Sequence, residues 1–373
     1  MDAVGIIAEY NPFHAGHAFH IARTRQELGA CAVVAVMSGN FVQRGECAVL
    51  DKWARTRLAL QGGVDLVLEL PTVWAVSSAE GFARGAAGIL AATGVVTHLS
   101  FGSECGDVEP LRQVAACLDS EPYQAGLRRF LDDGMPFAAC RQAVVRNMLG
   151  QGLSDLLSQP NNNLGVEYIR ALNAIKSAIR PITIPRTGAG HDGGDHPDYP
   201  SASFLRERML AGELPAGNPA SLKYGERGAL AVLRTMAEAD FVALPDCGEG
   251  LSQRIFRAVR QGVALEEICG LAKTKRYAHA RIRRAVLWGA LGLKACDRPD
   301  CPPYIRVLGA NQRGRGVLRE MKTAATRPVI TKPAHGKGLP LLELEARCTD
   351  LYQLYRQTPG PCGLEWTTGP VML

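Results

Sequence analysis

The chain has 373 residues, more than one hydrophobic core usually organises, so we expect about two domains. Apolar residues make up 47% of it, which is typical of a globular protein and not of a disordered one. No run of about 18 uncharged apolar residues occurs, so we expect no membrane span. The first residues lack the basic start of a signal peptide, and we expect a cytoplasmic protein.

The formal net charge is +6, but the basic residues are concentrated in one stretch. Between Lys273 and Lys332 there are fifteen Lys and Arg against three acids (Asp297, Asp300 and Glu320), a balance of +12. The rest of the chain must therefore carry about −6. This asymmetry predicts that one part of the protein meets a polyanion.

The eleven cysteines are scattered and odd in number, so we expect reduced thiols and no disulfides. Cys296 and Cys301 form the closest pair, but no second pair and no His lies at ligand spacing from them. The sequence therefore predicts no metal site.

Short apolar runs alternate with amphipathic stretches over the first hundred residues. We expect the apolar runs to be strands buried on both faces of a sheet, with helices between them. This alternation predicts a doubly wound α/β domain with a mostly parallel, Rossmann-like sheet. The predicted strands are residues 4–8, 32–37, 64–68 and 95–101, and the predicted helices are residues 16–28, 52–61 and 78–92.

The remainder of the chain is predicted to be mainly helical. A connector rich in Pro and Gly, residues 212–224, suggests a boundary between domains of residues 1–215 and 216–373. Few periodic signals follow residue 334. The predicted elements are helices 166–179 and 201–210, a strand at 182–184, a loop at 188–200, and helices 226–238, 250–261, 264–271 and 278–291.

Two histidines, His14 and His17, follow the first predicted strand, with Gly16 between them. Ligands of doubly wound sheets bind beyond the carboxyl ends of the strands. Glycine lets the backbone approach a bulky ligand, and the N-terminus of the next helix offers N–H groups to phosphate. Imidazoles there can stabilise charge during displacement at an α-phosphorus. The alternative is a pair of capping or surface histidines.

A second segment, residues 201–206, reads Ser-Ala-Ser-Phe-Leu-Arg. The hydroxyls of Ser201 and Ser203 can bind phosphate oxygens, and Arg206 can balance the charge of the β- and γ-phosphates. Taken alone, the segment also fits a simple helix N-cap. The polar loop at residues 37–46, after the second predicted strand, fits a substrate-contacting loop and an ordinary connection equally well.

The H-x-G-H pattern resembles the signature of nucleotidylyltransferases and class I aminoacyl-tRNA synthetases. Over residues 1 to about 210, the chain is similar to the tRNA(Met) cytidine acetate ligase family. The resemblance extends more weakly through KTKRYAHARIRR in the basic part. It rests on GIIAEYNPFHAGH, MSGNFVQRGE, DKWAR, GVDLVLELP, SFGSE, PNNNLGVEY, PRTGAGHD and SASFLR, which occur in this order.

The resemblance implies an enzyme that activates acetate with ATP to acetyl-adenylate and pyrophosphate. The acetyl group then passes to N4 of the wobble cytidine of elongator tRNA(Met), giving N4-acetylcytidine without acetyl-CoA. In this reading His14 and His17 stabilise charge, Arg206 holds the departing pyrophosphate, and Mg²⁺ accompanies ATP. The expected partners are ATP, acetate and the tRNA, with no protein partner.

The family's ATP contacts carry over to matching positions of this chain. Gly102 allows close approach of the adenosine, one amide of Asn161 or Asn162 can contact base or ribose, and Arg186 suits a phosphate oxygen. The first nucleotide-binding segment comprises Ile7, Ala8, Glu9, Tyr10, Asn11, Pro12, Phe13, His14, Ala15, Gly16, His17, Ala18, Phe19 and His20.

The basic stretch predicts tRNA binding, because a polyanion needs its phosphates neutralised over a wide surface. Tyr277 is expected to stack on an unpaired base, and Arg313 and Arg315 to follow a backbone from a glycine-rich loop. The residues expected to bind RNA are Lys273, Lys275, Arg276, Arg281, Arg283 and Arg284.

Two other functions remain open at this point. A nucleotidyltransferase that makes a small adenylylated cofactor, similar to pantetheine-phosphate adenylyltransferase, would share the histidine motif but would not need a basic second domain. A tRNA-binding protein with a relict nucleotide fold would retain tRNA whether or not ATP is present.

Overall fold

The computed structural model describes residues 2–132, 135–186 and 201–373. Within these ranges eight strands form one sheet, in which β5 and β8 pair antiparallel and the other pairings are parallel. This order confirms the predicted doubly wound, mostly parallel α/β fold. In sheet order the strands are β10 (Val371–Met372), β8 (Ile305–Ala310), β5 (Leu66–Leu70), β2 (Ala32–Ser38), β1 (Ala3–Ala8), β6 (Val96–Ser103) and β7 (Arg180–Pro185), with β9 (Val329–Ile330) beside β8.

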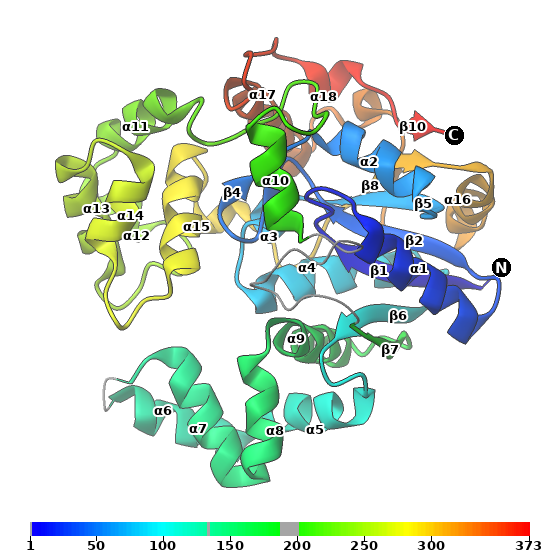
Figure 1. The fold of residues 1–373 in the computed structure, drawn as a ribbon, viewed down its shortest axis with the longest axis horizontal. Coiled ribbons are helices and arrows are strands. Elements are labelled where there is room, and N and C mark those ends of the chain that lie inside the picture. Colours follow the sequence, from blue (N-terminus) through cyan, green and yellow to red (C-terminus); the bar gives the residue numbers. More distant parts are fainter. Residues whose placement is uncertain (1, 133–134, 187–200) are drawn as a thin grey trace.

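Helices cover both faces of the sheet, which explains why its central strands are apolar at nearly every position (Figure 1). Val33 lies in the hydrophobic cluster that includes Ile21 and Trp53, whereas the next residue, Val34, lies in the cluster that includes Leu90. The helices between the first strands and next to β7 are α1 (Ala15–Leu28), α2 (Lys52–Gln61), α3 (Thr72–Ala75), α4 (Ala79–Ala92) and α9 (Pro160–Ala174).

Two groups of helices lie beside the sheet, and α10 (Ala202–Leu210) stands near the second of them (Figure 1). The predicted loop at residues 188–200 lies outside the described residues. The first group is α5 (Val108–Leu118), α6 (Glu121–Asp132), α7 (Phe137–Leu149) and α8 (Gln151–Asp155), with η1 (Leu156–Ser158); the second is α11 (Glu226–Thr235), α12 (Glu238–Val242), α13 (Leu251–Gln261), α14 (Leu265–Ala272) and α15 (His279–Ala290).

After α15 the chain returns to the sheet, so strands from both sides of residue 216 share one sheet. The sequence shows few periodic signals of secondary structure after residue 334, yet a 15-residue helix, α17, forms there. Its buried face includes Glu345, Thr349 and Gln353, and these polar residues break the apolar period that marks a helix. The elements are η2 (Ala295–Asp297), α16 (Gln312–Ala324), η3 (Pro333–Gly336), α17 (Pro340–Leu354) and α18 (Leu364–Thr367).

No helix within the described ranges has both the length and the apolar character that crossing a bilayer requires.

Candidate active site

A cavity of about 490 Å³ opens at the carboxyl ends of β1 and β6. We call it the switch-point cavity, because the strand order runs from β1 to β2 on one side and to β6 on the other. The predicted residues Pro12, Phe13, Ala15, Ala18 and Phe19 are not part of its wall. The predicted residues that line it are Ile7, Ala8, Glu9, Tyr10, Asn11, His14, Gly16, His17, His20, Gly102, Asn161, Arg186, Ser201, Ser203 and Arg206.

The turn after β1 is held by two arginines. Tyr10 has a φ of 45°, a left-handed conformation that is uncommon for a residue with a side chain. On one side of it, Arg55 donates to the carbonyl of Glu9 at 2.6 Å, and on the other side Arg206 donates to the carbonyl of Asn11 at 2.9 Å. These bonds fix the backbone that leads into the histidine motif.

The two histidines of the motif begin α1 and stack with ring centroids 3.8 Å apart. The Nδ1 of His14 accepts from the backbone N–H of Gly16 at 3.1 Å, and the Nδ1 of His17 accepts from the N–H of His14 at 3.2 Å. In a neutral ring Nε2 then carries the proton and is a donor. A Cβ at Gly16 would lie 3.0 Å from the His14 ring, so the glycine makes this packing possible.

Burial keeps the imidazoles neutral near pH 7. Burial, and after it the charge of Arg186, lowers the pKa of His14 to about 4. The pKa of His17 is also well below its usual value, mainly through burial and then through His14. His20, whose pKa burial lowers to about 4, bonds Ser100 on β6 through Nε2 at 3.0 Å. The motif thus offers neutral hydrogen-bond donors.

Two arginines approach the cavity from other elements. Arg206 on α10 donates to the Ser203 hydroxyl at 3.0 Å, and Ser201 caps the same helix by accepting from the backbone of Phe204 at 3.2 Å. Arg186, just after β7, donates to Asn161 at 3.2 Å. A guanidinium has five donors, so both arginines keep donors available for an anion.

Only one of the two candidate amides lines the cavity. Asn162 is fully buried, and its Oδ1 accepts from the backbone of Glu104 at 2.9 Å and of Cys105 at 3.1 Å. Its side chain therefore shapes the loop after β6 and does not face a ligand. Neighbouring positions on a helix point about 100° apart, which is why Asn161 lies in the wall and Asn162 does not.

Several lining residues were not singled out from the sequence. The β3–β4 hairpin (Phe41–Val42 and Glu46–Cys47) brings Gln43, Arg44 and Glu46 to the wall, and contact of this loop with substrate stays a prediction. The backbone N–H of Gln43 donates to Glu9 at 2.7 Å, and burial raises the pKa of the Glu9 carboxyl. Phe82 on α4 also lines the wall; its apolar type in a buried helix gives no signal in the sequence.

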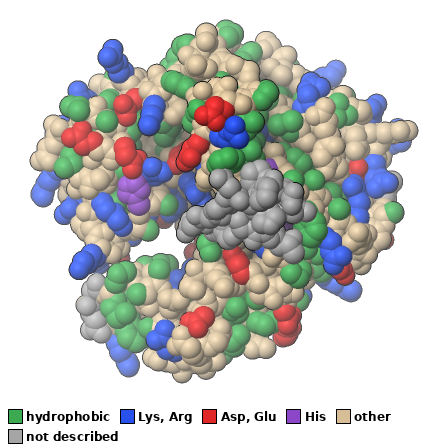
Figure 2. All heavy atoms as spheres, in the orientation of Figure 1, with side chains coloured by type: hydrophobic (Ala, Val, Ile, Leu, Met, Phe, Trp, Pro, Cys, Tyr) green, Lys and Arg blue, Asp and Glu red, His purple; other side chains and the backbone are tan. Residues whose placement is uncertain are grey.

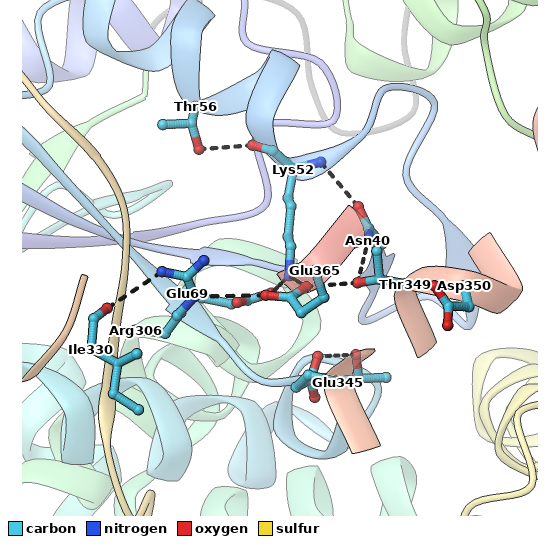
Figure 3. Close-up of polar contacts among 12 residues, drawn as sticks. Asn40, Lys52, Thr56, Glu69, Arg306, Ile330, Glu345, Thr349, Asp350 and Glu365 are labelled. Carbon is cyan, nitrogen blue, oxygen red and sulfur yellow. Dashed lines mark hydrogen bonds and ion pairs between the residues drawn. The ribbon is translucent and has the colours of Figure 1, made fainter. Parts of the chain in front are cut away.

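Close to this loop lies a group of charged residues that we call the buried ion cluster (Figure 3). The Lys52 ammonium donates to Glu69 at 2.6 Å and to Glu365 at 2.5 Å, and all three side chains are at most 1% exposed. Asn40 accepts from the backbone of Lys52 at 3.0 Å and donates to Thr349 at 3.2 Å. The cluster ties α17 and α18 to the loop that enters the cavity wall. Its ionisable members are Lys52, Glu69, Arg306, Glu345 and Glu365.

The basic residues predicted to bind RNA lie on or next to α15, where Lys and Arg are interspersed with Asp and Glu (Figure 2). Arg283 pairs with Glu46 at 2.5 Å and with Glu266 at 2.8 Å, while Arg276 and Arg281 approach Glu249 at 3.7 and 3.4 Å. The positive charge of this group is therefore partly neutralised within the chain. Lys273 donates to the Tyr277 carbonyl at 2.5 Å, Arg284 to the Gln43 carbonyl at 3.4 Å, and Lys275 is exposed.

Two expectations about the basic stretch are wrong. Tyr277 is only 4% exposed and donates its hydroxyl to the Glu249 carbonyl at 2.5 Å, so it cannot stack on a base. Arg313 and Arg315 belong to helix α16 and not to a loop. This helix follows β8, which runs antiparallel to β5. It therefore starts at the end of the sheet where the parallel strands begin, opposite the switch-point cavity. The glycines around these arginines suggested a loop, but Asn311 caps a helix there.

Comparisons with known proteins agree with this geometry. The sequence profile of the HIGH Nucleotidyl Transferase family matches residues 1–361. The tRNA(Met) cytidine acetate ligase of Thermoanaerobacter sp. (strain X514) is 36% identical to this chain, and the alignment covers 98% of each of the two chains. The tRNA(Met) cytidine acetate ligase of Caldanaerobacter subterraneus subsp. tengcongensis is 37% identical, and the alignment covers 95% of each. Crystal structures of Thermotoga maritima TmcAL, apo and bound with alpha-thio ATP, are 32% identical, cover 100% of both chains and superpose with TM-scores of 0.93 and 0.91. The chain therefore belongs to the HIGH nucleotidyl transferase family and, within it, to the tRNA(Met) cytidine acetate ligases, as its motifs predict.

Proposed function

We propose that this protein is an ATP-dependent ligase that activates acetate and transfers the acetyl group to N4 of the wobble cytidine of elongator tRNA(Met). The observation that carries the proposal is the pair of neutral, stacked imidazoles in the switch-point cavity, with two arginines converging on the same space. The bound alpha-thio ATP of the Thermotoga maritima relative supports ATP as the nucleotide.

In the first step an acetate oxygen attacks the α-phosphorus of ATP, and the bond to the β-phosphate breaks. His14 and His17 donate from Nε2 to α-phosphate oxygens, where charge grows in the transition state. Arg206 and the Ser203 hydroxyl hold the pyrophosphate as it leaves, and Arg186 binds a phosphate oxygen. Neutral imidazoles suit this role, because each can donate a hydrogen bond from Nε2 without carrying a charge of its own.

The second step uses the mixed anhydride without a covalent enzyme intermediate. The cytidine N4 forms a bond to the acetyl carbon, the acyl C–O bond breaks, and AMP leaves with the electron pair. N4 loses one proton to solvent in the process. No described cysteine needs to act as a nucleophile, since acetyl-adenylate is already activated.

Mg²⁺ accompanies ATP in this proposal and screens the charge of its phosphates. Among the described residues no group of three or more His, Cys, Asp or Glu is arranged to hold a metal ion. Glu9 and Glu46 line the cavity, and one or two carboxylates together with substrate phosphates are a usual set of Mg²⁺ ligands. These two residues would hold the ion.

The helical group α11–α15 supplies the tRNA-binding surface in this proposal, and residue 216 marks its start as a domain. Lys273, Lys275 and Arg276 are exposed there and can neutralise backbone phosphates. All eleven cysteines, which lie within the described residues, are free thiols, and this supports a reducing cytoplasm as the place of action.

Two linked assays on the purified protein test the proposal. Exchange of labelled pyrophosphate into ATP should require acetate, and mass spectrometry of tRNA incubated with ATP and labelled acetate should show N4-acetylcytidine. Acetyl-CoA in place of acetate and ATP should give no product. Exchange that needs a phosphorylated acceptor, or tRNA binding with no exchange under any condition, would overturn it in favour of a cofactor-forming transferase or a binding protein.

A further inference from the structure

A second cavity, of about 390 Å³, adjoins the switch-point cavity. It lies between α10, the β3–β4 hairpin, α14 and α15, and we call it the α15 cavity. The start of α10 lines the switch-point cavity and Leu210 at its end lines the α15 cavity, while Arg206 lines both. The hairpin is divided in the same way, since Gln43 faces the first cavity, Cys47 the second, and Glu46 both. Helix and hairpin thus form a partition between the two spaces.

The walls of the α15 cavity suit a flat, partly polar ring. Leu222, Leu265 and Val286 provide apolar surface. The ring of Tyr355, a buried residue with a polar hydroxyl, also lines the cavity. At the partition the Glu46 carboxylate can accept a hydrogen bond from an amine. Apolar walls with a few placed polar groups are the usual receptor of a base that an enzyme extrudes from its stack.

The cavity is also next to the basic helix. Gly45 has a φ of +78°, and a Cβ there would lie 2.7 Å from the backbone of Arg283 and Arg284, so the hairpin packs directly on α15. Arg283 reaches across this contact to Glu46 at 2.5 Å. An RNA backbone bound at the start of α15 would therefore lie beside the cavity mouth and beside the partition.

We propose that the α15 cavity receives the target cytidine, extruded from the anticodon loop, with its N4 directed at the partition between the two cavities. This inference rests on the proposed function and names the place of its second substrate. Because the switch-point cavity holds the adenylate, the acceptor amine must come from an adjoining space. The α15 cavity shares Arg206 and Glu46 with it and has the basic helix as its outer wall.

Variants that fill the α15 cavity test this placement. Ala290→Phe fills it from α15 and Leu222→Trp fills it from the opposite segment, while Ala116→Phe changes an exposed position of α5 outside both cavities. We expect both filling variants to keep acetate-dependent pyrophosphate exchange and to bind tRNA about tenfold more weakly, because they lose one base contact. With saturating tRNA they should form acetylcytidine about 100-fold more slowly, since a misplaced substrate costs about that much. Ala116→Phe should behave as the unaltered protein.

Retained exchange shows that the variants are folded and that the first step is intact. Acetylation by both filling variants at the rate of Ala116→Phe would overturn the inference, and so would parallel loss of exchange in both, because the cavity would then belong to the ATP step. If the unaltered protein shows no acetate-dependent exchange, the proposed function fails instead. The two failures are therefore distinguishable.

A binding measurement checks the same point without activity. An anticodon stem-loop RNA that lacks the wobble base should bind the unaltered protein about tenfold more weakly than the complete RNA, as expected for the loss of one base contact. Ala290→Phe should bind the two RNAs equally. Equal binding of both RNAs by the unaltered protein would exclude a base receptor.

Discussion

The switch-point cavity and the buried ion cluster both collect charged residues near the carboxyl edge of the sheet, but they differ in accessibility. In the cluster Lys52, Glu69 and Glu365 are at most 1% exposed and are bonded to one another. In the cavity Arg186 is exposed, and Arg206 uses two of its five donors for protein contacts. A concentration of charge therefore does not mark a site. A binding site is marked by hydrogen-bond donors that remain available to a ligand.

The largest effect should come from breaking the cluster. Lys52→Met removes the cation that bonds two buried carboxylates, and we expect the free energy of unfolding to fall by about 3–5 kcal/mol. Denaturant titration would measure this. The matched control is Arg84→Met, which removes an exposed ion pair with Asp300 and should leave the titration unchanged. Equal destabilisation by the two variants would contradict the distinction.

A change in the cavity should act on rate and not on stability. His17→Ala removes one donor to the growing negative charge, and we expect acetate-dependent pyrophosphate exchange to slow by about 10²–10³-fold. His98→Ala, at a histidine on β6 whose ring bonds the Thr97 hydroxyl and which lies outside the wall of the switch-point cavity, is the control and should exchange normally. A normal exchange rate for His17→Ala would remove the basis of the proposed mechanism.

A smaller effect, on ATP affinity, is expected from changing Arg186, an exposed residue that lines the switch-point cavity. Arg186→Met should weaken ATP binding by about tenfold, the usual cost of one hydrogen bond to a charged group. Burial is the main cause of the low pKa of His14, and Arg186 is the second, so the pKa should rise from about 4 toward its usual value in the variant. Calorimetry and an NMR titration of the free protein would follow the two changes; an unaltered His14 titration would show that Arg186 is remote from the motif.

A further effect concerns the pH dependence of stability and the cluster. Burial raises the pKa of Glu345 to about 8, so the folded protein keeps a proton that the unfolded chain releases above about 4.5. This group therefore stabilises the fold less and less as pH rises from about 4.5 to about 8. Glu345→Gln, which stays neutral, should flatten the decline in unfolding free energy over that range. A decline as steep as in the unaltered protein would show that Glu345 is ionised in the fold.

The parts of the molecule that could be predicted are those encoded locally. The alternation of strands and helices predicted the sheet, and His14, Gly16 and His17 lie within four residues, so their motif was visible and its place at the switch point followed. Lys52 and Glu365 are 313 residues apart, and nothing in either segment indicates the other. Asn161 and Asn162 are adjacent in sequence, and only the helix that begins at Pro160 separates their directions.

The position of Glu365 in the chain also has a consequence for biosynthesis. Lys52 is synthesised 313 residues before Glu365, so its ammonium gains this second carboxylate partner late. Until then it has one of its two bonded carboxylates, Glu69, and β10, which completes one edge of the sheet, has not been made. Nascent chains that end before Glu365 should therefore be less stable and open to proteolysis.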